Sequence, residues 1–437
     1  MRIGVNEQAK QLTAHHNRLM SHTPVAAHPA TPVPASRLIG WLSLAQLITW
    51  GSVFYTFALL MVPIENELGL SRAEASLGFS LALLAEGLLA YPVGRWIDRG
   101  HERVVMTGGS LLVGACLLLH SGVTSALGFY AVWLGLGAGL AATLYPPAFA
   151  VLTRRYPHNF RRAIITLTFL GGLASTVFIP LSAWLIATLG WRHALWVLAA
   201  MHLFVCAPLH AWLLRHAPVT DQSADRAANQ ETSGHAPVPR SALGQHLWSA
   251  PFVLTGAFIV LLMAATAALP AHLVSLLREN QLPEAWVLTT VASIGVLQVL
   301  GRALMYFFEH HVDLHQVNRF VPTLIPLGLA ALLMTPMFQT AHAVLVMLFV
   351  LLYGMGNGML TIVKGTAIAE YVNRDHVATL NGALGLPTAL ARAAAPLLMG
   401  LMWSPQTGYT AGLWLLLITS LLGVAALMGA QRLSARP

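Results

Sequence analysis

The sequence has very little charge for its length. Only 9% of its 437 residues are Asp, Glu, Lys or Arg, whereas 56% are hydrophobic and the mean hydropathy is +0.67. Soluble proteins carry about 25% charged residues, and they need this charge on their surface to stay in solution. The scarcity of charge therefore excludes an ordinary soluble protein and predicts an integral membrane protein.

Cysteine is almost absent as well. Cys116 and Cys206 both lie inside apolar runs, so the chain has neither a disulfide framework nor a cysteine-rich metal site. The sequence also lacks HExxH and GxSxG patterns, a nucleotide-binding loop, and an appended soluble domain long enough for signalling. We therefore expect no enzyme, no cofactor and no bound metal.

Apolar runs long enough to cross about 30 Å of hydrocarbon recur along the chain. They predict twelve transmembrane helices in two sets of six. The first set covers 39–62, 74–94, 104–122, 127–151, 163–187 and 193–214, and the second covers 250–276, 286–308, 320–339, 342–366, 378–402 and 409–430. A polar stretch rich in Ala, Pro and Ser lies between the sets and reads as a linker.

The predicted fold is therefore an all-α integral membrane protein. It consists of a disordered N-terminal tail, a six-helix half, a cytoplasmic linker and a second six-helix half, over 1–37, 38–215, 216–248 and 249–432.

The basic residues predict the orientation of the chain. With the N-terminus placed in the cytoplasm, eighteen of the 24 Lys and Arg fall on that side, three fall outside and three lie within apolar runs. Cytoplasmic loops carry an excess of Lys and Arg, so both termini are predicted to be cytoplasmic, in the inner (plasma) membrane. The net charge of +8 then reflects topology, and no nucleic-acid partner is expected.

The turn between the second and third predicted spans reads GRWIDRGHERVVM, residues 94–106. The excess of basic residues in cytoplasmic loops is enough to explain its arginines. It would leave the glycine and the aspartate unexplained. The stretch resembles the loop between helices two and three of the major facilitator superfamily, roughly G-x-x-x-D-R-x-G-R-[KR]. The matching residues are Gly94, Asp98, Arg99 and Arg103, while His101 and Glu102 depart from the pattern.

This resemblance implies a secondary transporter that works by alternating access. It also implies that the cluster latches the outward-facing state on the cytoplasmic side. Gly94 is expected to let two helices approach closely there.

Four ionisable residues lie within predicted spans, where a charge costs about 2.5–3.5 kcal/mol or more. They are Glu86, Arg302, Lys364 and Arg392. Arg302 resembles the span-eight arginine of monocarboxylate transporters and oxalate/formate antiporters, which implies contact with a substrate carboxylate. Arg392 resembles a second cation on helix eleven of the antiporters. Gln298 stands where monocarboxylate transporters often carry an aspartate.

These charges allow more than one interpretation. We predict that Arg302 and Arg392 form one anion site, because guanidinium binds carboxylate through two parallel hydrogen bonds. Lys364 is a further candidate for contact with the substrate. The alternatives are that Arg302 and Lys364 snorkel to the cytoplasmic face, and that Arg392 pairs with Glu86. Glu86 is otherwise the candidate proton carrier, which makes protons the candidate coupling ion.

Other polar side chains are candidates to complete an anion site, although ordinary packing is the simpler interpretation of each. They are Tyr55, Tyr145, His272 and Gln298. The predicted cargo is a small organic anion, most simply a carboxylate. The alternative is an exporter of drugs or of another solute on the same fold, although span five lacks the G-P-x-x-G-G pattern of drug/proton antiporters. The protein is expected to be a monomer in the bilayer.

Overall fold

The computed structural model describes residues 35–156, 160–215, 247–280, 282–308, 314–373 and 377–434. Throughout these residues the chain is helical, apart from turns and one isolated bridge between Ser404 and Gly408. The predicted tail lies outside the described residues except for 35–37, which begin the first helix. The predicted linker lies outside them except for 247–248.

The N-terminal half contains the elements up to α11. They are α2 (Ala35–Thr49), η1 (Trp50–Tyr55), α3 (Phe57–Leu68), α4 (Arg72–Trp96), η2 (Ile97–His101), α5 (Glu102–Ser121), α6 (Ala126–Thr143), α7 (Tyr145–Arg155), α8 (Phe160–Gly172), α9 (Ala174–Leu189), α10 (Trp191–Met201), η3 (His202–Cys206) and α11 (Ala207–Leu213).

The C-terminal half begins at α14. Its elements are α14 (Ala250–Glu279), α15 (Glu284–Phe308), α16 (Leu314–Met334), η4 (Gln339–Ala341), α17 (His342–Tyr371), α18 (Val377–Ala383), α19 (Gly385–Leu401) and α20 (Thr410–Ser434).

The described residues include eleven helical segments long and apolar enough to cross a membrane. One of them, Arg72–Ser121, is 50 residues long. It contains two predicted spans, because the chain reverses where Gly100 adopts a φ of 88°, a conformation that glycine reaches without steric cost. The twelve crossings and the all-α fold predicted from the sequence are therefore confirmed. The largest boundary error is the span predicted over 320–339, which the structure places at Leu314–Met334.

Two of the spans are interrupted at positions that matter for the site. Span one contains the π-helical segment Trp50–Tyr55, and such segments occur frequently at functional sites. Span four breaks at Leu144, which has extended backbone, and restarts at Tyr145 with prolines in the first turn of α7, where proline is tolerated. Tyr55 is the last residue of the π-helical segment, and Tyr145 is the first residue of α7.

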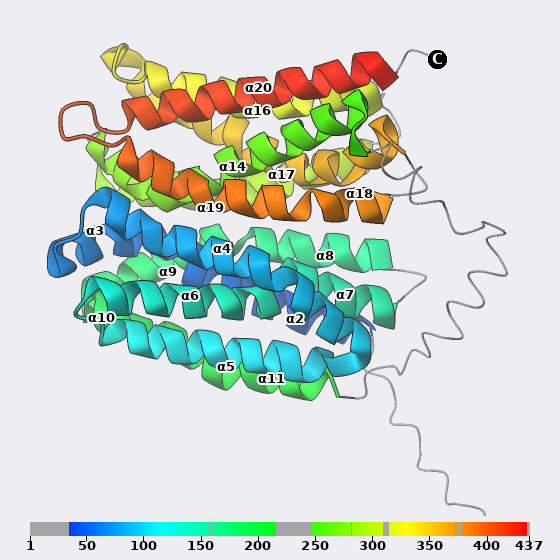
Figure 1. The fold of residues 1–437 in the computed structure, drawn as a ribbon. Helices are drawn as coiled ribbons and strands as arrows, with labels where there is room; N and C mark the ends of the chain where they lie inside the picture. Colours follow the sequence, from blue (N-terminus) through cyan, green and yellow to red (C-terminus); the bar gives the residue numbers. More distant parts are fainter. Residues whose placement is uncertain are drawn as a thin grey trace, which may run out of the picture.

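The two halves lie side by side, with α14–α20 above α2–α11 in the view of Figure 1. We call the end of the bundle near Ala35 and Ser434 the termini end and the opposite end the far end. The halves meet at several places, and two of these contacts, between α4 and α19 and between α15 and α8–α9, are called seams below. Further contacts join α14 to α3 and η1.

The seam between α4 and α19 is tight at the far end and opens toward the termini end. A Cβ on Gly400 would stand 2.2 Å from the Ser76 Oγ, and one on Gly87 would stand 2.3 Å from the Ala389 Cβ. Gly94 lies two helical turns beyond Gly87 on the same face, yet no atom of the described residues lies within 4 Å of its Cβ position. The helices visibly diverge toward the right in Figure 1. The close approach predicted at Gly94 is therefore wrong for this conformation, and it occurs at Gly87 instead.

Candidate functional site

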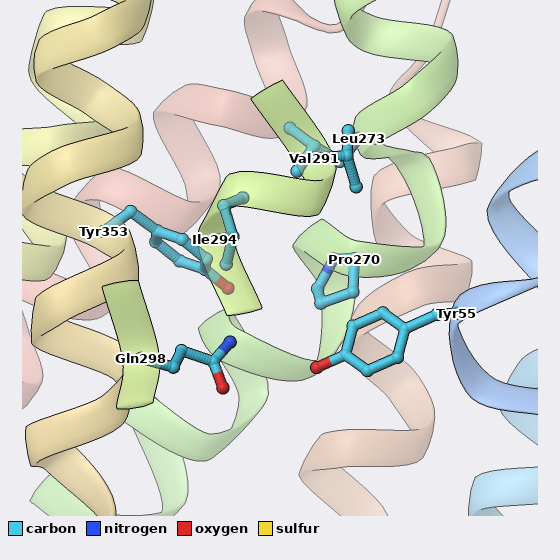
Figure 2. A pocket seen from close by; sticks show the side chains of 7 residues that line it. All are labelled: Tyr55, Pro270, Leu273, Val291, Ile294, Gln298 and Tyr353. Carbon is cyan, nitrogen blue, oxygen red and sulfur yellow. The ribbon is translucent and has the colours of Figure 1, made fainter. Parts of the chain in front are cut away.

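A small cavity lies where span one of the N-terminal half meets the C-terminal half. Figure 2 shows its lining: Tyr55, Pro270, Leu273, Val291, Ile294, Gln298 and Tyr353. About 10 Å³ is open to the centre of a water molecule, which is roughly room for one water. The walls are mostly apolar, with a few polar groups directed inward, as is typical of small-molecule sites.

Pro270 explains part of the shape of the cavity. A proline inside a helix cannot bond to the carbonyl four residues earlier, which here belongs to Thr266. The Tyr353 hydroxyl donates to that Thr266 carbonyl at 3.5 Å, so a side chain of α17 reaches the carbonyl that has no backbone donor from Pro270. Pro270 and Tyr353 both line the cavity.

Two polar side chains face each other across the cavity. The Tyr55 hydroxyl and the Gln298 amide point toward one another in Figure 2, and they interact. The charge of Arg302 also acts on Tyr55. Gln298 is 5% exposed and belongs to α15, one helical turn before Arg302. The predicted candidates Tyr55 and Gln298 therefore lie together, next to a buried cation.

Arg302 bridges the seam between the halves. It is 7% exposed, and its Nη1 donates to the Thr168 carbonyl of α8 at 2.6 Å while its Nε donates to the Gly358 carbonyl of α17 at 3.3 Å. A Cβ on Gly172 would stand 2.8 Å from Nη1, so that glycine makes room for the guanidinium. The guanidinium of Arg302 is therefore buried in the contact between the two halves. Within the described residues its partners are neutral groups, the two backbone carbonyls and the Tyr145 hydroxyl, and it forms no ion pair.

Tyr145 lies beside the same guanidinium. A Cβ on Gly171 would stand 2.6 Å from the Tyr145 hydroxyl, and the tyrosine interacts with Arg302. Its ring stacks on Phe149, with the centroids 5.4 Å apart. The Gly171–Gly172 pair thus accommodates both the hydroxyl and the guanidinium.

Arg392 has a different environment. Its Nη2 and Nη1 donate to the two carboxylate oxygens of Glu86 at 3.2 and 3.4 Å, across the seam of α19 and α4. The Lys364 ammonium donates to the Met263 sulfur at 3.2 Å, and it interacts electrostatically with both Arg392 and Glu86. The ion pair raised as an alternative from the sequence is therefore present. Arg302 and Arg392 belong to two different seams. We therefore propose Arg302 alone as the anion site, in place of the predicted joint site.

His272 does not line the cavity, although its helical neighbours Pro270 and Leu273 do. It is fully buried, with Nε2 2.9 Å from the Pro396 carbonyl and Nδ1 3.1 Å from the Tyr409 hydroxyl. The structure therefore places this candidate in a contact between α14, α19 and the start of α20, on the far-end side of the cavity.

The turn after α4 has an acidic centre. Asp98, Arg99 and Arg103 are exposed, whereas Glu102 is fully buried. Arg155 of α7 donates to Glu102 at 2.8 and 2.5 Å. Glu102 is a residue that departs from the superfamily pattern, and it joins the turn to the C-terminal end of α7.

The sequence did not indicate every residue of the site. Tyr353 lines the cavity, but a single tyrosine in an apolar span resembles ordinary core packing. The carbonyls of Thr168 and Gly358 hold Arg302 through the backbone, which has no characteristic residue type. The glycine pair 171–172 is visible in the sequence, but its contact with an arginine of another span is not.

Comparison with known proteins fits this architecture. The sequence model of the Major Facilitator Superfamily matches residues 42–396. The chain belongs to the Major Facilitator Superfamily.

Its relatives include monocarboxylate transporter 13 of Rattus norvegicus, which is 28% identical over 327 residues, covering 73% of this chain and 69% of the relative. Monocarboxylate transporter 13 of Bos taurus is 27% identical over 328 residues, with the same two coverages. The protein is thus a multi-pass membrane transporter and not an enzyme, as the sequence predicted.

Solved structures share the fold at low identity. A bacterial homologue of the human lysosomal transporter Spinster superposes with a TM-score of 0.67 at 16% identity, over 91% of this chain and 97% of that one. The nucleoside transporter NupG has a TM-score of 0.66 at 16% identity, over 93% of this chain and 100% of that one. These similarities concern the fold alone.

Proposed function

We propose that this superfamily member is a secondary transporter that carries a small organic anion with one carboxylate across the inner membrane by alternating access. The observation that supports this proposal best is the buried guanidinium of Arg302. An isolated buried charge is expensive unless an anion compensates it. Its protein partners in the described residues are neutral, namely two backbone carbonyls and the Tyr145 hydroxyl, so a substrate carboxylate is the group that would complete its environment.

The surroundings of Arg302 suit such a substrate. A guanidinium can donate two parallel hydrogen bonds to a carboxylate, while the hydroxyls of Tyr55 and Tyr145 and the amide of Gln298 offer further donors. The neighbouring cavity walls are apolar and would accept a short hydrocarbon chain. The cavity has room for about one water in this conformation, so substrate entry requires the walls to move apart. The relatives named monocarboxylate transporter 13 support the same substrate class.

We propose the orientation of the chain in the membrane from the distribution of its basic residues. The turns and loops at the termini end hold most of the basic residues, so we place both termini in the cytoplasm. The far end then faces outward. In this orientation the seam of α4 and α19 is open toward the cytoplasm and tight on the outside.

Coupling to protons is assigned to Glu86. Protonation would remove its charge and with it the ion pair to Arg392, which joins α4 to α19. Proton binding would therefore loosen this seam. Glu86→Gln should flatten the pH dependence of transport measured in proteoliposomes at several fixed pH values. A pH profile identical to that of the unmodified protein would assign Glu86 a structural role.

The substrate proposal is tested by counterflow. Proteoliposomes loaded with unlabelled lactate should accumulate radiolabelled lactate or another short monocarboxylate, and Arg302→Gln should abolish this exchange. Arg278→Gln is the matched control, because Arg278 pairs with Glu284 at the far end, 2.5 Å away, and touches no part of the cavity. If labelled neutral or cationic solutes exchange equally well in the Arg302→Gln protein, the carried solute is not an anion and the exporter alternative takes its place.

A further inference from the structure

The far end of the molecule holds a cluster of polar side chains that crosses from one half to the other. Arg72, at the start of α4, is its centre. Its Nε lies 2.6 Å from the Glu65 carboxylate of α3, and its Nη1 lies 3.3 Å from the Glu279 carboxylate at the end of α14. Arg72 therefore joins an acid of its own half to an acid of the other half.

Aromatic residues of the C-terminal half complete the environment of Arg72. Its Nη1 donates to the Tyr409 hydroxyl at 2.5 Å, and its guanidinium lies 4.5 Å from the centre of the Trp403 ring. The Trp403 indole N–H donates to Glu279 at 2.9 Å. The Arg72 side chain is 10% exposed, so these interactions are shielded from solvent and are stronger than those of an exposed pair.

The cluster continues inward to His272. A carbonyl can only accept a hydrogen bond, so the contact with Pro396 places the proton of the neutral imidazole on Nε2. Nδ1 is then an acceptor, and the Tyr409 hydroxyl donates to it while accepting from Arg72. Burial raises the pKa of the Tyr409 phenol, and Arg72 opposes that rise only in part. The phenol therefore keeps the proton that this chain of hydrogen bonds requires.

The chain of contacts ends beside the candidate cavity. His272 lies between Pro270 and Leu273 on α14, and both of those residues line the cavity. Figure 2 shows the two residues on successive parts of the same helix. Movement of this part of α14 would therefore shift the imidazole, and the imidazole would carry the shift to Tyr409 and Arg72.

We propose that Arg72, Glu65, Glu279, Trp403 and Tyr409 form a lock that holds the far end of the two halves closed, and that His272 connects this lock to the cavity wall. The lock must open for the far end to admit solute. The inference goes beyond the proposed function, since it holds for any solute that the cavity accepts.

A second arginine at the same end provides a matched control. Arg192 lies 2.7 Å from Glu67 and over the ring of Trp191, 4.4 Å from its centre. This group has the same residue types as the lock, an arginine, a glutamate and a tryptophan. All three belong to the N-terminal half, so the group cannot hold the halves together.

The experiment measures access to the cavity from the far end. Val291→Cys supplies a reporter thiol on the cavity wall, in a protein whose two native cysteines are replaced by alanine. Right-side-out membrane vesicles are treated with a membrane-impermeant, positively charged methanethiosulfonate, and the rate of thiol modification is followed. No substrate is added, so failure of this test and failure of the anion proposal are distinguishable.

Arg72→Gln and Tyr409→Phe should raise the modification rate roughly tenfold, since each removes a hydrogen bond to a charged group across the halves. Arg192→Gln should leave it within about twofold. Tyr409→Phe keeps the ring and removes only the hydroxyl, so the test remains available if Arg72→Gln folds poorly. Equal rates for Arg192→Gln, Arg72→Gln and Tyr409→Phe would overturn the lock. His272→Leu should also raise the rate, and an unchanged rate in that variant would remove the connection to the cavity.

Discussion

At the seam of α4 and α19, an arginine faces a carboxylate of the other half. At the seam of α15 and α8, an arginine faces backbone carbonyls. Arg392 makes two hydrogen bonds to Glu86, whereas Arg302 donates to Thr168 and Gly358. Both guanidinium groups link the two halves, but only the first has its charge neutralised within the described residues.

This difference separates two uses of an arginine inside a membrane protein. A charge paired with a fixed carboxylate holds two helices together and has little to offer a ligand. A charge held only by neutral groups keeps its place and remains available to an anion that comes and goes. The same residue type therefore serves cohesion at one seam and, in our proposal, substrate binding at the other.

The strongest test of this comparison removes each arginine in turn. Arg302→Gln should lower the affinity for a carboxylate roughly 10- to 100-fold, because hydrogen bonds to charged groups contribute about 1.5–3 kcal/mol. Arg302→Lys should lose less, since it keeps the charge and loses only the fork. Equilibrium binding to purified protein measures both. If Arg392→Gln weakens binding as much as Arg302→Gln, the two seams do not differ as proposed and the joint site returns.

For stability we expect the reverse order, with the larger effect at the pair of Glu86 and Arg392. Glu86→Ala leaves the partly buried Arg392, whose side chain is 21% exposed, without its partner, and the loss should approach the lower end of the range of about 3–5 kcal/mol that breaking a buried pair costs. The double variant Glu86→Ala/Arg392→Ala should be more stable than Glu86→Ala alone, because no unpaired charge remains. Thermal unfolding in detergent detects the difference. A double variant that is as unstable as the sum of the two single variants would show that the pair has no coupling energy.

The seam with Arg302 can be made to resemble the other seam. Gln298→Asp places a carboxyl one helical turn before Arg302, within reach of its guanidinium. While protonated at low pH, the new carboxyl leaves Arg302 free for substrate, and when it ionises as pH rises it neutralises Arg302. Transport should therefore decline with rising pH in this variant and not in Gln298→Asn. Parallel pH profiles for the two variants would separate Gln298 from the binding of the anion.

The smallest expected effect concerns the room that a glycine provides. Gly172→Ala places a methyl group 2.8 Å from the Arg302 Nη1, so the flexible guanidinium must shift by a few tenths of an ångström. We expect a loss of substrate affinity of a few-fold. Gly40→Ala is the control, because its Cβ position has nothing within 4 Å. Identical affinities in the two variants would mean that the position of Arg302 is not critical.

The sequence alone determined the number of spans and their order. Long apolar runs have to be buried in hydrocarbon, and their length is set by the thickness of the bilayer, so the twelve crossings needed no information about packing. The sequence also indicated which residues are unusual, since a charge such as Arg302 or Glu86 in an apolar run is costly wherever the helix lies. The family resemblance at Gly94 and Asp98 rested on residues read in register, and it identified the superfamily.

Only the tertiary structure decided which charges meet. Glu86 and Arg392 are 306 residues apart in the chain, and no local pattern states whether the carboxylate will reach Arg392 or Arg302. The same holds for the lock, where Arg72 and Tyr409 come from opposite halves, and for the acceptors of Arg302, which are carbonyls that every residue possesses. Hydrophobic periodicity fixes what a helix buries, whereas the partner of a buried charge depends on how two halves pack, and that is a property of the whole fold.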